Sequence, residues 1–370
     1  MGELTSPARR LRLGMVGGGR PTGIGEIHRL AARLDGRYEL VAGCFSRDPA
    51  RGREAARRLL IAPERCYADW RGMADGEAGR ADRIDVVAVV SGNDTHVPAT
   101  TTFLGRGFDV MCEKPLALVH EAAQSVRAAA ERAGRIVALG HYFAGFAMLR
   151  QARAMVAEGA LGAIRMVQSE HASEGLALGT PDGRAPVGVI ADLGVHAAFL
   201  VRFVAGVAIA RVAADAARFT PDRPVEDDAR VLLRLAGGGR GVIWVSHAAS
   251  GHRRWIRLRI AGSKGALDWS IGEPDLLRHT PVAEPTRLLQ RAGRGLSANA
   301  GIVSRLPSGH VEGTIEALAT VYGDLADAVA TRRSVARPLY PDIEDGAAGA
   351  AFIEASMRSV ARDGAWVDVP

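Results

Sequence analysis

The sequence predicts an α/β protein with an N-terminal domain, residues 1–140, built on a parallel sheet, and a C-terminal α+β domain, residues 141–370, with a large open, mainly antiparallel sheet. In the N-terminal part, apolar segments of strand length alternate with helical patterns, an order typical of parallel sheets covered by helices. In the C-terminal part, short strands follow one another through glycine turns, which indicates antiparallel pairing. A chain of 370 residues is also longer than a single core usually reaches, so two domains are expected.

The composition is that of a globular protein and excludes several function classes. Hydrophobic residues make up 48% of the chain, enough for a sizeable core, and the three cysteines are too few for a disulfide scaffold and lack metal-ligand spacing. The net charge of +6 raises nucleic acid as a partner, but the arginines are scattered rather than clustered with aromatic residues, so none is expected. No segment resembles a signal-peptide core or a membrane span, which predicts a cytoplasmic protein without a membrane partner.

The first strand, Leu11–Val16, runs directly into a glycine-rich turn, and a helical pattern follows with apolar residues at positions 27, 30, 31 and 34. In this context, glycines let the backbone approach the pyrophosphate of a dinucleotide, whose charge is met by the free N–H groups at the helix start. The spacing departs from G-x-G-x-x-G because about three residues are inserted after the first two motif glycines. Five residues are predicted to bind the cofactor here: Gly17, Gly19, Gly23, Ile24 and Gly25.

The second strand, Tyr38–Cys44, ends in small residues rather than in the Asp or Glu that usually binds the ribose 2′-hydroxyl of NAD. Ser46 and Arg47 follow and can receive the 2′-phosphate of NADP, because a guanidinium pairs well with phosphate. Asp48 remains an alternative ribose acceptor, and Arg47 is also explained as a surface charge beside a helix cap. The sequence therefore predicts NADP or NAD as the cofactor and slightly favours NADP.

A β-branched run, Ile84–Val90, predicts the central strand of the parallel sheet. The turn after it carries Asn93 and His96, and ligands of open parallel sheets bind beyond the carboxyl ends of the strands. Both residues are predicted to lie at the cofactor, although a turn former or a helix cap would also explain them. A helix from about 97 to 105 leads to the next strand.

The segment Asp109–Pro115 is a short apolar strand that ends in a carboxylate, an amine and a proline. Lys114 and Lys264 are the two lysines among 47 basic residues, and the rest are arginines. An amine can be tuned to lose its proton by burial or by neighbours, whereas arginine stays charged. We therefore predict a catalytic Lys114, with a solvated surface charge as the plain alternative, and a structural Lys264 in a glycine turn.

In the C-terminal part, a helical segment that starts near Ile190 carries Asp192 and His196 four residues apart, on one face of an otherwise apolar helix. A buried carboxylate and a buried imidazole need polar partners, and an amine such as that of Lys114 is a natural one.

Local patterns predict the remaining elements as ranges. They are helices over 119–133, 148–158, 314–330 and 344–362, strands over 135–139, 161–170, 229–235, 241–247, 255–261 and 266–269, a loop over 174–186 and an irregular stretch over 283–306.

Together these motifs resemble the Gfo/Idh/MocA family, which is named after glucose–fructose oxidoreductase, inositol dehydrogenase and rhizopine catabolism. The similarity covers nearly the whole chain and rests on Gly17–Gly25, Asn93, His96, Glu113-Lys114-Pro115 and Asp192-Leu193-Gly194-Val195-His196. It implies a Rossmann domain, hydride transfer at C4 of a nicotinamide and a second domain whose open sheet commonly forms a homo-oligomer, a dimer or a tetramer.

The resemblance also implies the roles of single residues. Lys114, Asp192 and His196 form the catalytic group: His196 or Lys114 exchanges the proton of the substrate hydroxyl, and Asp192 orients or charges the other two. Glu113 and Lys114 are expected at the cofactor, and no metal is required. Substrate contacts are expected from His141, Tyr142 and His310.

One departure from the family concerns the substrate. Relatives commonly carry Asn and Tyr after the position of His141, whereas Tyr142 and Phe143 stand here. A less polar pocket is therefore expected, which fits a glycoside, a deoxysugar or a decorated aglycone.

The sequence thus predicts an NAD(P)-dependent oxidoreductase that acts on a secondary alcohol or ketone of a sugar, a cyclitol or a glycoside-like substrate. The alternative is a redox-neutral enzyme with tightly bound nucleotide that oxidises only transiently, such as an epimerase, a lyase or a glycoside-cleaving enzyme. A non-catalytic NADP-binding sensor is a third class, but a binding protein has no need of a titratable buried group.

Overall fold

The chain forms two compact units, and the computed structural model describes residues 9–175, 187–332 and 337–370. The first unit consists of the chain up to Ala117, of Glu121–Gly145 and of Thr314–Ala347; the second consists of Leu118–His120, Phe146–Gly313 and Ala348–Pro370. The predicted division at residue 140 differs from these units mainly because Thr314–Ala347 belongs to the first; in addition, residues 141–145 belong to the first unit and Leu118–His120 to the second. The loop predicted over 174–186 lies outside the described residues from position 176 onward.

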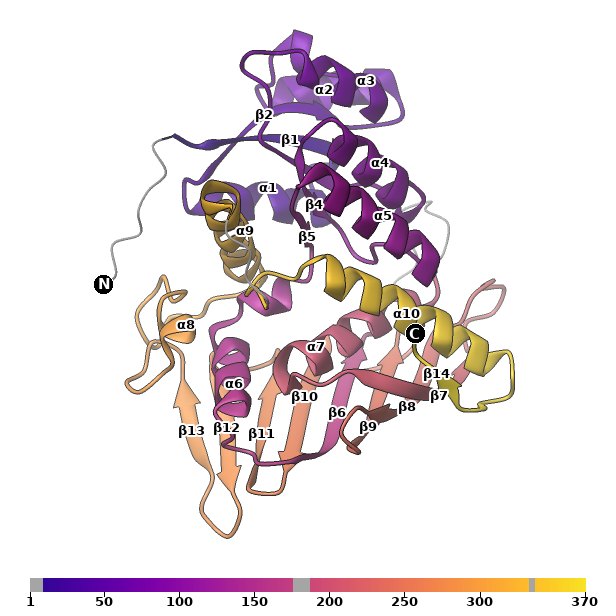
Figure 1. Cartoon of the computed structure of the whole chain (residues 1–370), viewed down its shortest axis with the longest axis vertical. Helices are drawn as coiled ribbons and strands as arrows, with labels where there is room; N and C mark the ends of the chain where they lie inside the picture. Colours follow the sequence, from indigo (N-terminus) through magenta and orange to yellow (C-terminus); the bar gives the residue numbers. More distant parts are fainter. Residues whose placement is uncertain (1–8, 176–186, 333–336) are drawn as a thin grey trace. The chain divides into compact units, whose positions relative to one another are not determined.

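The first unit is built on a five-stranded sheet in which all neighbouring strands are parallel (Figure 1). In spatial order the strands are β2 (Tyr38–Cys44), β1 (Leu11–Gly17), β3 (Val86–Val90), β4 (Asp109–Cys112) and β5 (Val137–Leu139). Strand β3 lies at the centre and is buried throughout, as its β-branched sequence predicts. The chain order reverses between β1 and β3, so their carboxyl ends form the switch point at which open α/β sheets bind ligands.

Six helices accompany this sheet in the described residues: α1 (Ile24–Leu34), α2 (Pro49–Arg58), α3 (Trp70–Ala78), α4 (Asn93–Gly105), α5 (His120–Ala133, from Glu121 onward in this unit) and α9 (Thr314–Thr331). Two short turns, η1 (Pro63–Arg65) and η2 (Tyr142–Gly145), complete it. Helix α4 begins at Asn93, earlier than the predicted start near 97. The reason is that Gly92 is extended and Thr95 already donates its backbone N–H to the Gly92 carbonyl at 2.9 Å.

Helices α1 and α9 pack side by side (Figure 1), which explains why the late segment returns to the first unit. The apolar pattern correctly predicts that α1 is a helix but not which face it buries, since Leu30 and Leu34 are 41% and 47% exposed. Its buried face instead contains His28 and Arg29. Both side chains have polar partners within the unit, so burial does not leave them unsatisfied.

The second unit is built on a nine-stranded sheet in which β6 and β9 are parallel and the other pairs are antiparallel. In spatial order the strands are β13 (Arg287–Gln290), β12 (Leu276–Pro281), β11 (Gly265–Ser270), β10 (Trp255–Gly262), β6 (Ile164–Ala172), β9 (Arg240–Ser246), β8 (Asp228–Leu235), β7 (Ile209–Ala217) and β14 (Val367–Asp368). This mixed but mainly antiparallel sheet confirms the predicted fold class.

The sequence patterns predict β6 and strands β8 to β11 but miss β7, β12 and the two edge strands, β13 and β14. Strand β13 lies inside the stretch 283–306, so the prediction of an irregular segment there is wrong. The reason is that three of its four residues are exposed, so no apolar alternation marks it, and it takes its form from pairing with β12.

Helices α6 (Ala147–Ala157) and α7 (Val195–Ala205) pack on one face of this sheet (Figure 1). The core between them is apolar and is lined by Leu149, Ala152, Val204, Leu258, Ile260, Leu267, Trp269 and Leu277. A π-helical turn, η3 (Ile190–Gly194), leads directly into α7, and α8 (Ala298–Gly301) and α10 (Ile343–Val360) are the other helices placed in the described chain. None of the helices in the described residues is long and apolar enough to cross a membrane.

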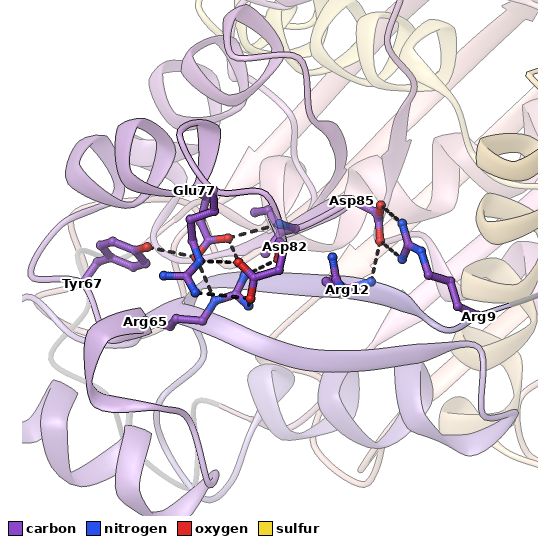
Figure 2. A network of polar contacts seen from close by, with 9 residues as sticks. Arg9, Arg12, Arg65, Tyr67, Glu77, Asp82 and Asp85 are labelled. Atoms are coloured by element: carbon purple, nitrogen blue, oxygen red, sulfur yellow. Dashed lines mark hydrogen bonds and ion pairs between the residues drawn. The ribbon is translucent and has the colours of Figure 1, made fainter.

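A buried ion pair joins η1 to α3 in the first unit, and Figure 2 shows Arg65 and Tyr67 directed at the carboxylate of Glu77. Arg65 donates to Glu77 at 3.0 and 2.5 Å, and the Tyr67 hydroxyl and the Ile84 backbone N–H donate to it at 2.9 and 3.1 Å. Glu77 is fully buried at 0% exposure. Four donors therefore compensate the desolvation of this one carboxylate.

We expect Glu77→Ala to destabilise the first unit by about 3 kcal/mol, because it leaves a buried guanidinium without its main partner. The matched control is Arg9→Ala, which removes an ion pair with Asp85 in which the arginine side chain is 55% exposed (Figure 2). That loss is expected to stay below ~1 kcal/mol. Urea unfolding followed by circular dichroism measures both, and equal losses would contradict the role assigned to Glu77.

Candidate functional site

The glycine turn between β1 and α1 packs directly against the end of β3, at the switch point of the sheet. Gly17 has a φ of 80°, and a Cβ added to it would lie 2.8 Å from the Ser91 Cα. A Cβ on Gly25 would lie 2.4 Å from the Gly18 Cα. Larger residues at either position would push the turn apart, so the packing of the turn requires glycine at both.

Two arginines that sequence reasoning missed hold the carbonyl oxygens of this turn. Arg29 of α1 donates to the Gly18 carbonyl and, at 2.8 Å, to the Arg20 carbonyl. Arg58 of α2 donates to the Gly19 carbonyl. Gly23 caps α1 without any side-chain hydrogen bond, so the first N–H groups of the helix are left for a ligand. A helix start next to two guanidinium groups suits a pyrophosphate, as the sequence predicts.

The residues after β2 already have partners. Arg47 forms an ion pair with Asp94 at 2.5 Å, between the end of β2 and the start of α4, and its side chain is 79% exposed. Asp48 caps α2 by accepting the backbone N–H groups of Ala50 and Arg51 at 2.8 and 3.2 Å, and these bonds lower the pKa of its carboxyl. The Ser46 hydroxyl accepts the Asp48 backbone N–H at 3.1 Å. Arg47 and Asp48 therefore act as the ion pair and helix cap that the plain alternative describes.

Asn93 and His96 both lie on the first turns of α4 at the switch point. His96 is 1% exposed, and its Nδ1 and Nε2 lie 2.8 Å and 3.2 Å from the carbonyl oxygens of Pro115 and Ser91. It thus connects the turn after β3 to the segment after β4. Cofactor contact by these residues stays a prediction, and for His96 the structure provides a positioning role.

Strand β4 delivers Glu113 and Lys114 to the same edge of the sheet. Glu113 is 6% exposed, its Oε1 lies 2.9 Å from Nε2 of His28, and its Oε2 accepts the Lys114 backbone N–H at 3.2 Å. Burial raises the pKa of the Glu113 carboxyl, but the hydrogen bond from His28 and the charges of His28, Lys114 and His96 outweigh burial and lower it. The backbone of Lys114 therefore contacts a buried carboxylate, and the charge of its amine stabilises the ionised form of that carboxylate.

His28 and Tyr322 are two further residues of the site that the predictions miss. His28 is fully buried on α1, and its Nδ1 lies 2.8 Å from the hydroxyl of Tyr322 on α9. The pair is 294 residues apart in sequence, so no local pattern could indicate it. The only available signal is the polar His28-Arg29 pair within an otherwise amphipathic helix.

His141 and Tyr142 follow β5 in the first unit, and both are buried, at 1% and 6% exposure. Burial and the charge of Lys114 lower the pKa of His141 to about 3 against the opposing effect of Glu113, so the imidazole is neutral. The rings of Tyr142 and Phe143 lie 4.3 Å apart. The predicted apolar character of this segment is present, while substrate contact stays a prediction.

The second unit brings Asp192 together with residues of β6 and β9 rather than leaving it alone on a helix. Asp192 lies in the π-turn η3, and its Oδ2 is 3.0 Å from Nε2 of His247, which follows β9. Nδ1 of His247 is 3.3 Å from the Ser173 hydroxyl. The Asp192 side chain is 38% exposed, more than the predicted buried carboxylate, because the wide π-turn directs it toward the strand ends.

His196 is 4% exposed on α7, as predicted, and its ring centroid lies 5.7 Å from that of His171 on β6. His310, in contrast, is exposed, and its carbonyl oxygen accepts a hydrogen bond from Arg291, a side chain that also pairs with Asp275 and Glu312. The structure thus gives His310 no polar side-chain environment comparable to that of Asp192.

The predicted catalytic residues belong to different units, Lys114 to the first and Asp192 and His196 to the second. Their assembly into one group stays a prediction. Within the described residues, no three His, Cys, Asp or Glu side chains gather in a way that could hold a metal ion.

Comparison with known proteins identifies both halves of the chain. Residues 11–141 match the oxidoreductase family with an NAD-binding Rossmann fold, and residues 149–268 match the GFO/IDH/MocA C-terminal domain. The curated oxidoreductase YfiI of Bacillus subtilis, described as uncharacterised, is 32% identical over 98% of this chain and 97% of its own.

Two solved structures are similar along the whole chain. An oxidoreductase from Sinorhizobium meliloti is 41% identical with a TM-score of 0.90, covering 97% of this chain and 99% of that one. An inositol dehydrogenase homologue from Azotobacter vinelandii, in complex with NADH and myo-inositol, is 36% identical with a TM-score of 0.92, covering 98% of each chain. These matches confirm the predicted resemblance: the protein belongs to the GFO/IDH/MocA family of oxidoreductases and carries its NAD-binding Rossmann domain.

Proposed function

We propose that the protein is an NAD-dependent dehydrogenase that oxidises a secondary alcohol of a cyclitol or a closely related polyol. The observation that carries this proposal is the similarity, over 98% of both chains, to the inositol dehydrogenase homologue complexed with NADH and myo-inositol. The glycine turn, the uncapped start of α1 and the two arginines beside it suit the pyrophosphate of such a cofactor. A bound nicotinamide would supply the hydride acceptor, at its C4.

The residues of the chain then have to remove and hold one proton. Oxidation of a secondary alcohol releases a hydride and a proton, so a base must lie within ~3 Å of the hydroxyl. In the proposed group, His196 or Lys114 takes this proton, and Asp192 orients the base. Asp192 is itself fixed by the bond to His247, and Lys114 by its position beside Glu113.

The less polar segment after His141 bears on the substrate. Tyr142 and Phe143 are buried aromatic residues where relatives commonly carry polar ones, so a polyol with one ring face free of hydroxyl groups is favoured. A panel with myo-inositol, deoxy-inositols and methyl glycosides, followed by NADH absorbance at 340 nm, tests both the class and the preference. Turnover without net NADH formation would support the redox-neutral alternative instead.

We expect Lys114→Met to lower kcat by roughly 10²–10⁴, the span of a positioned proton transfer, while NADH binding stays intact. The chain offers a matched control in Lys264→Met, which removes the other lysine, in the exposed turn between β10 and β11. Steady-state rates and NADH fluorescence titration measure the two effects. Near-normal turnover of Lys114→Met would refute the catalytic assignment.

The cofactor preference follows from the charges around Arg47. A 2′-phosphate placed there would meet the carboxylates of Asp94 and Asp48 as well as the guanidinium, and the Asp94 carboxylate already occupies the guanidinium. We therefore propose NAD as the preferred cofactor, in place of the slight preference for NADP expected from Ser46 and Arg47 alone.

Asp94→Ala is expected to release Arg47 and to strengthen NADP⁺ binding about two- to fivefold, the size of an exposed ion pair, with little change for NAD⁺. The control is Asp75→Ala, which removes an exposed pair with Arg106 elsewhere in the same unit. Calorimetric titration of both variants with both nucleotides gives the comparison. Tighter NADP⁺ than NAD⁺ binding by the unmodified protein would overturn the proposed preference.

A further inference from the structure

Three buried side chains from distant parts of the first unit form one hydrogen-bonded chain. The carboxylate of Glu113 at the end of β4 meets Nε2 of His28 on α1 at 2.9 Å, and Nδ1 of His28 meets the hydroxyl of Tyr322 on α9 at 2.8 Å. Their exposures are 6%, 0% and 1%. Packing alone does not require such residues, because burying three polar groups is costly unless every bond is made.

The proton positions in this chain are determined by its two ends. An ionised carboxylate only accepts, so Nε2 of His28 carries a hydrogen and donates to Glu113. In a neutral imidazole Nδ1 then accepts, and the Tyr322 hydroxyl is the donor. Burial, and to a lesser extent the charge of Glu113, raises the pKa of Tyr322, which keeps this donor protonated. Glu113 therefore fixes the tautomer of His28, and the Tyr322 hydroxyl, by donating to Nδ1, holds the imidazole in the orientation in which it meets Glu113.

The anion held in this way is placed beside Lys114. Oε2 of Glu113 accepts the Lys114 backbone N–H at 3.2 Å, and a Cβ on residue 140 would lie 2.1 Å from Oε1, so the position of the carboxylate requires glycine there. The other titratable groups facing it in the first unit are His28 of α1, His96 of α4 and Tyr322 of α9, while His141 after β5 is neutral.

We propose that His28 and Tyr322 are positioning residues that hold the Glu113 carboxylate against Lys114 and thereby set the charge and orientation of that amine. The effect of this positioning on catalysis rests on the proposed function, in which the dehydrogenase needs Lys114 at the substrate hydroxyl. The hydrogen bonds between Tyr322 and His28 and between His28 and Glu113 can be tested without a substrate.

The small number of lysines in the protein allows a direct test of the charge of the Lys114 amine. Lys114 and Lys264 are the two lysines, and Lys264 is exposed, so the ratio of their modification rates by an amine-reactive reagent, read by mass spectrometry, has an internal standard. Only the uncharged amine reacts, and a neighbouring anion favours the charged form. In Glu113→Gln we expect the ratio for Lys114 at pH 8 to rise about three- to tenfold.

Substitutions that remove the hydrogen bonds of Tyr322 or His28 should also raise the modification ratio of Lys114, but by less than Glu113→Gln does. Tyr322→Phe removes only the hydroxyl and is expected to raise the ratio about twofold. Tyr38→Phe is the matched control, because it removes an equally buried hydroxyl. That hydroxyl donates to the Tyr322 carbonyl at 2.9 Å but makes no hydrogen bond to His28 or Glu113 among the contacts described above. His28→Gln retains an N–H donor and should stay near the parent ratio, whereas His28→Leu should resemble Tyr322→Phe or exceed it.

The outcomes separate this proposal from the proposed function. An unchanged ratio in Glu113→Gln, or an equal rise in Tyr38→Phe and Tyr322→Phe, overturns the positioning role even if the enzyme oxidises cyclitols. A graded rise in Glu113→Gln and Tyr322→Phe supports it even if no polyol is turned over, and Tyr322→Phe keeps the test decisive should His28→Leu fail to fold. With an active substrate, Tyr322→Phe should lower kcat severalfold without changing the KM for NAD⁺.

Discussion

A buried negative charge at the end of β4 is the constraint on which the first unit depends. An ionised carboxylate is costly to bury unless donors surround it in good geometry, and for Glu113 those donors come from α1 and from the backbone of Lys114. Helix α1 in turn packs against α9, because the second ring nitrogen of His28 has its partner in the Tyr322 hydroxyl. One charge thus determines why two helices from opposite ends of the chain lie together, and why α1 turns a histidine inward while leaving two leucines outside.

Most of the sheet architecture could be predicted because local sequence periodicity indicates it. A pattern within about ten residues is enough to predict the β-branched strand β3, the glycine turn after β1 and the alternating strands β8 to β10. The edge strand β13 and the return of α9 to the first unit could not be predicted, because both depend on a partner elsewhere in the chain. The spacing of apolar residues also failed to predict the buried face of α1, because that face contains His28, which is buried through two polar partners.

The site shows the same division between what a sequence reveals and what it conceals. Lys114 stands out because lysine is so rare here, and Asp192 and His196 because of their spacing in an apolar segment. His247, the partner of Asp192, and Tyr322, the partner of His28, do not stand out, since these contacts arise only from folding. The π-turn was equally hidden: it changes the direction of Asp192, so a residue expected inside the core reaches the strand ends instead.

The return of α9 has a consequence for the order in which the chain is made and folded. When Gly145 has been synthesised, all five strands of the parallel sheet exist, but the helix that covers α1 and Tyr38 does not. The whole second sheet except β14 is translated before Thr314, a delay of roughly ten to thirty seconds at ordinary elongation rates. During this interval the face of α1 that α9 covers is exposed, and Nδ1 of His28 lacks the hydroxyl of Tyr322. The N-terminal unit, although it begins the chain, is therefore completed only after strands β6 to β13 have been made.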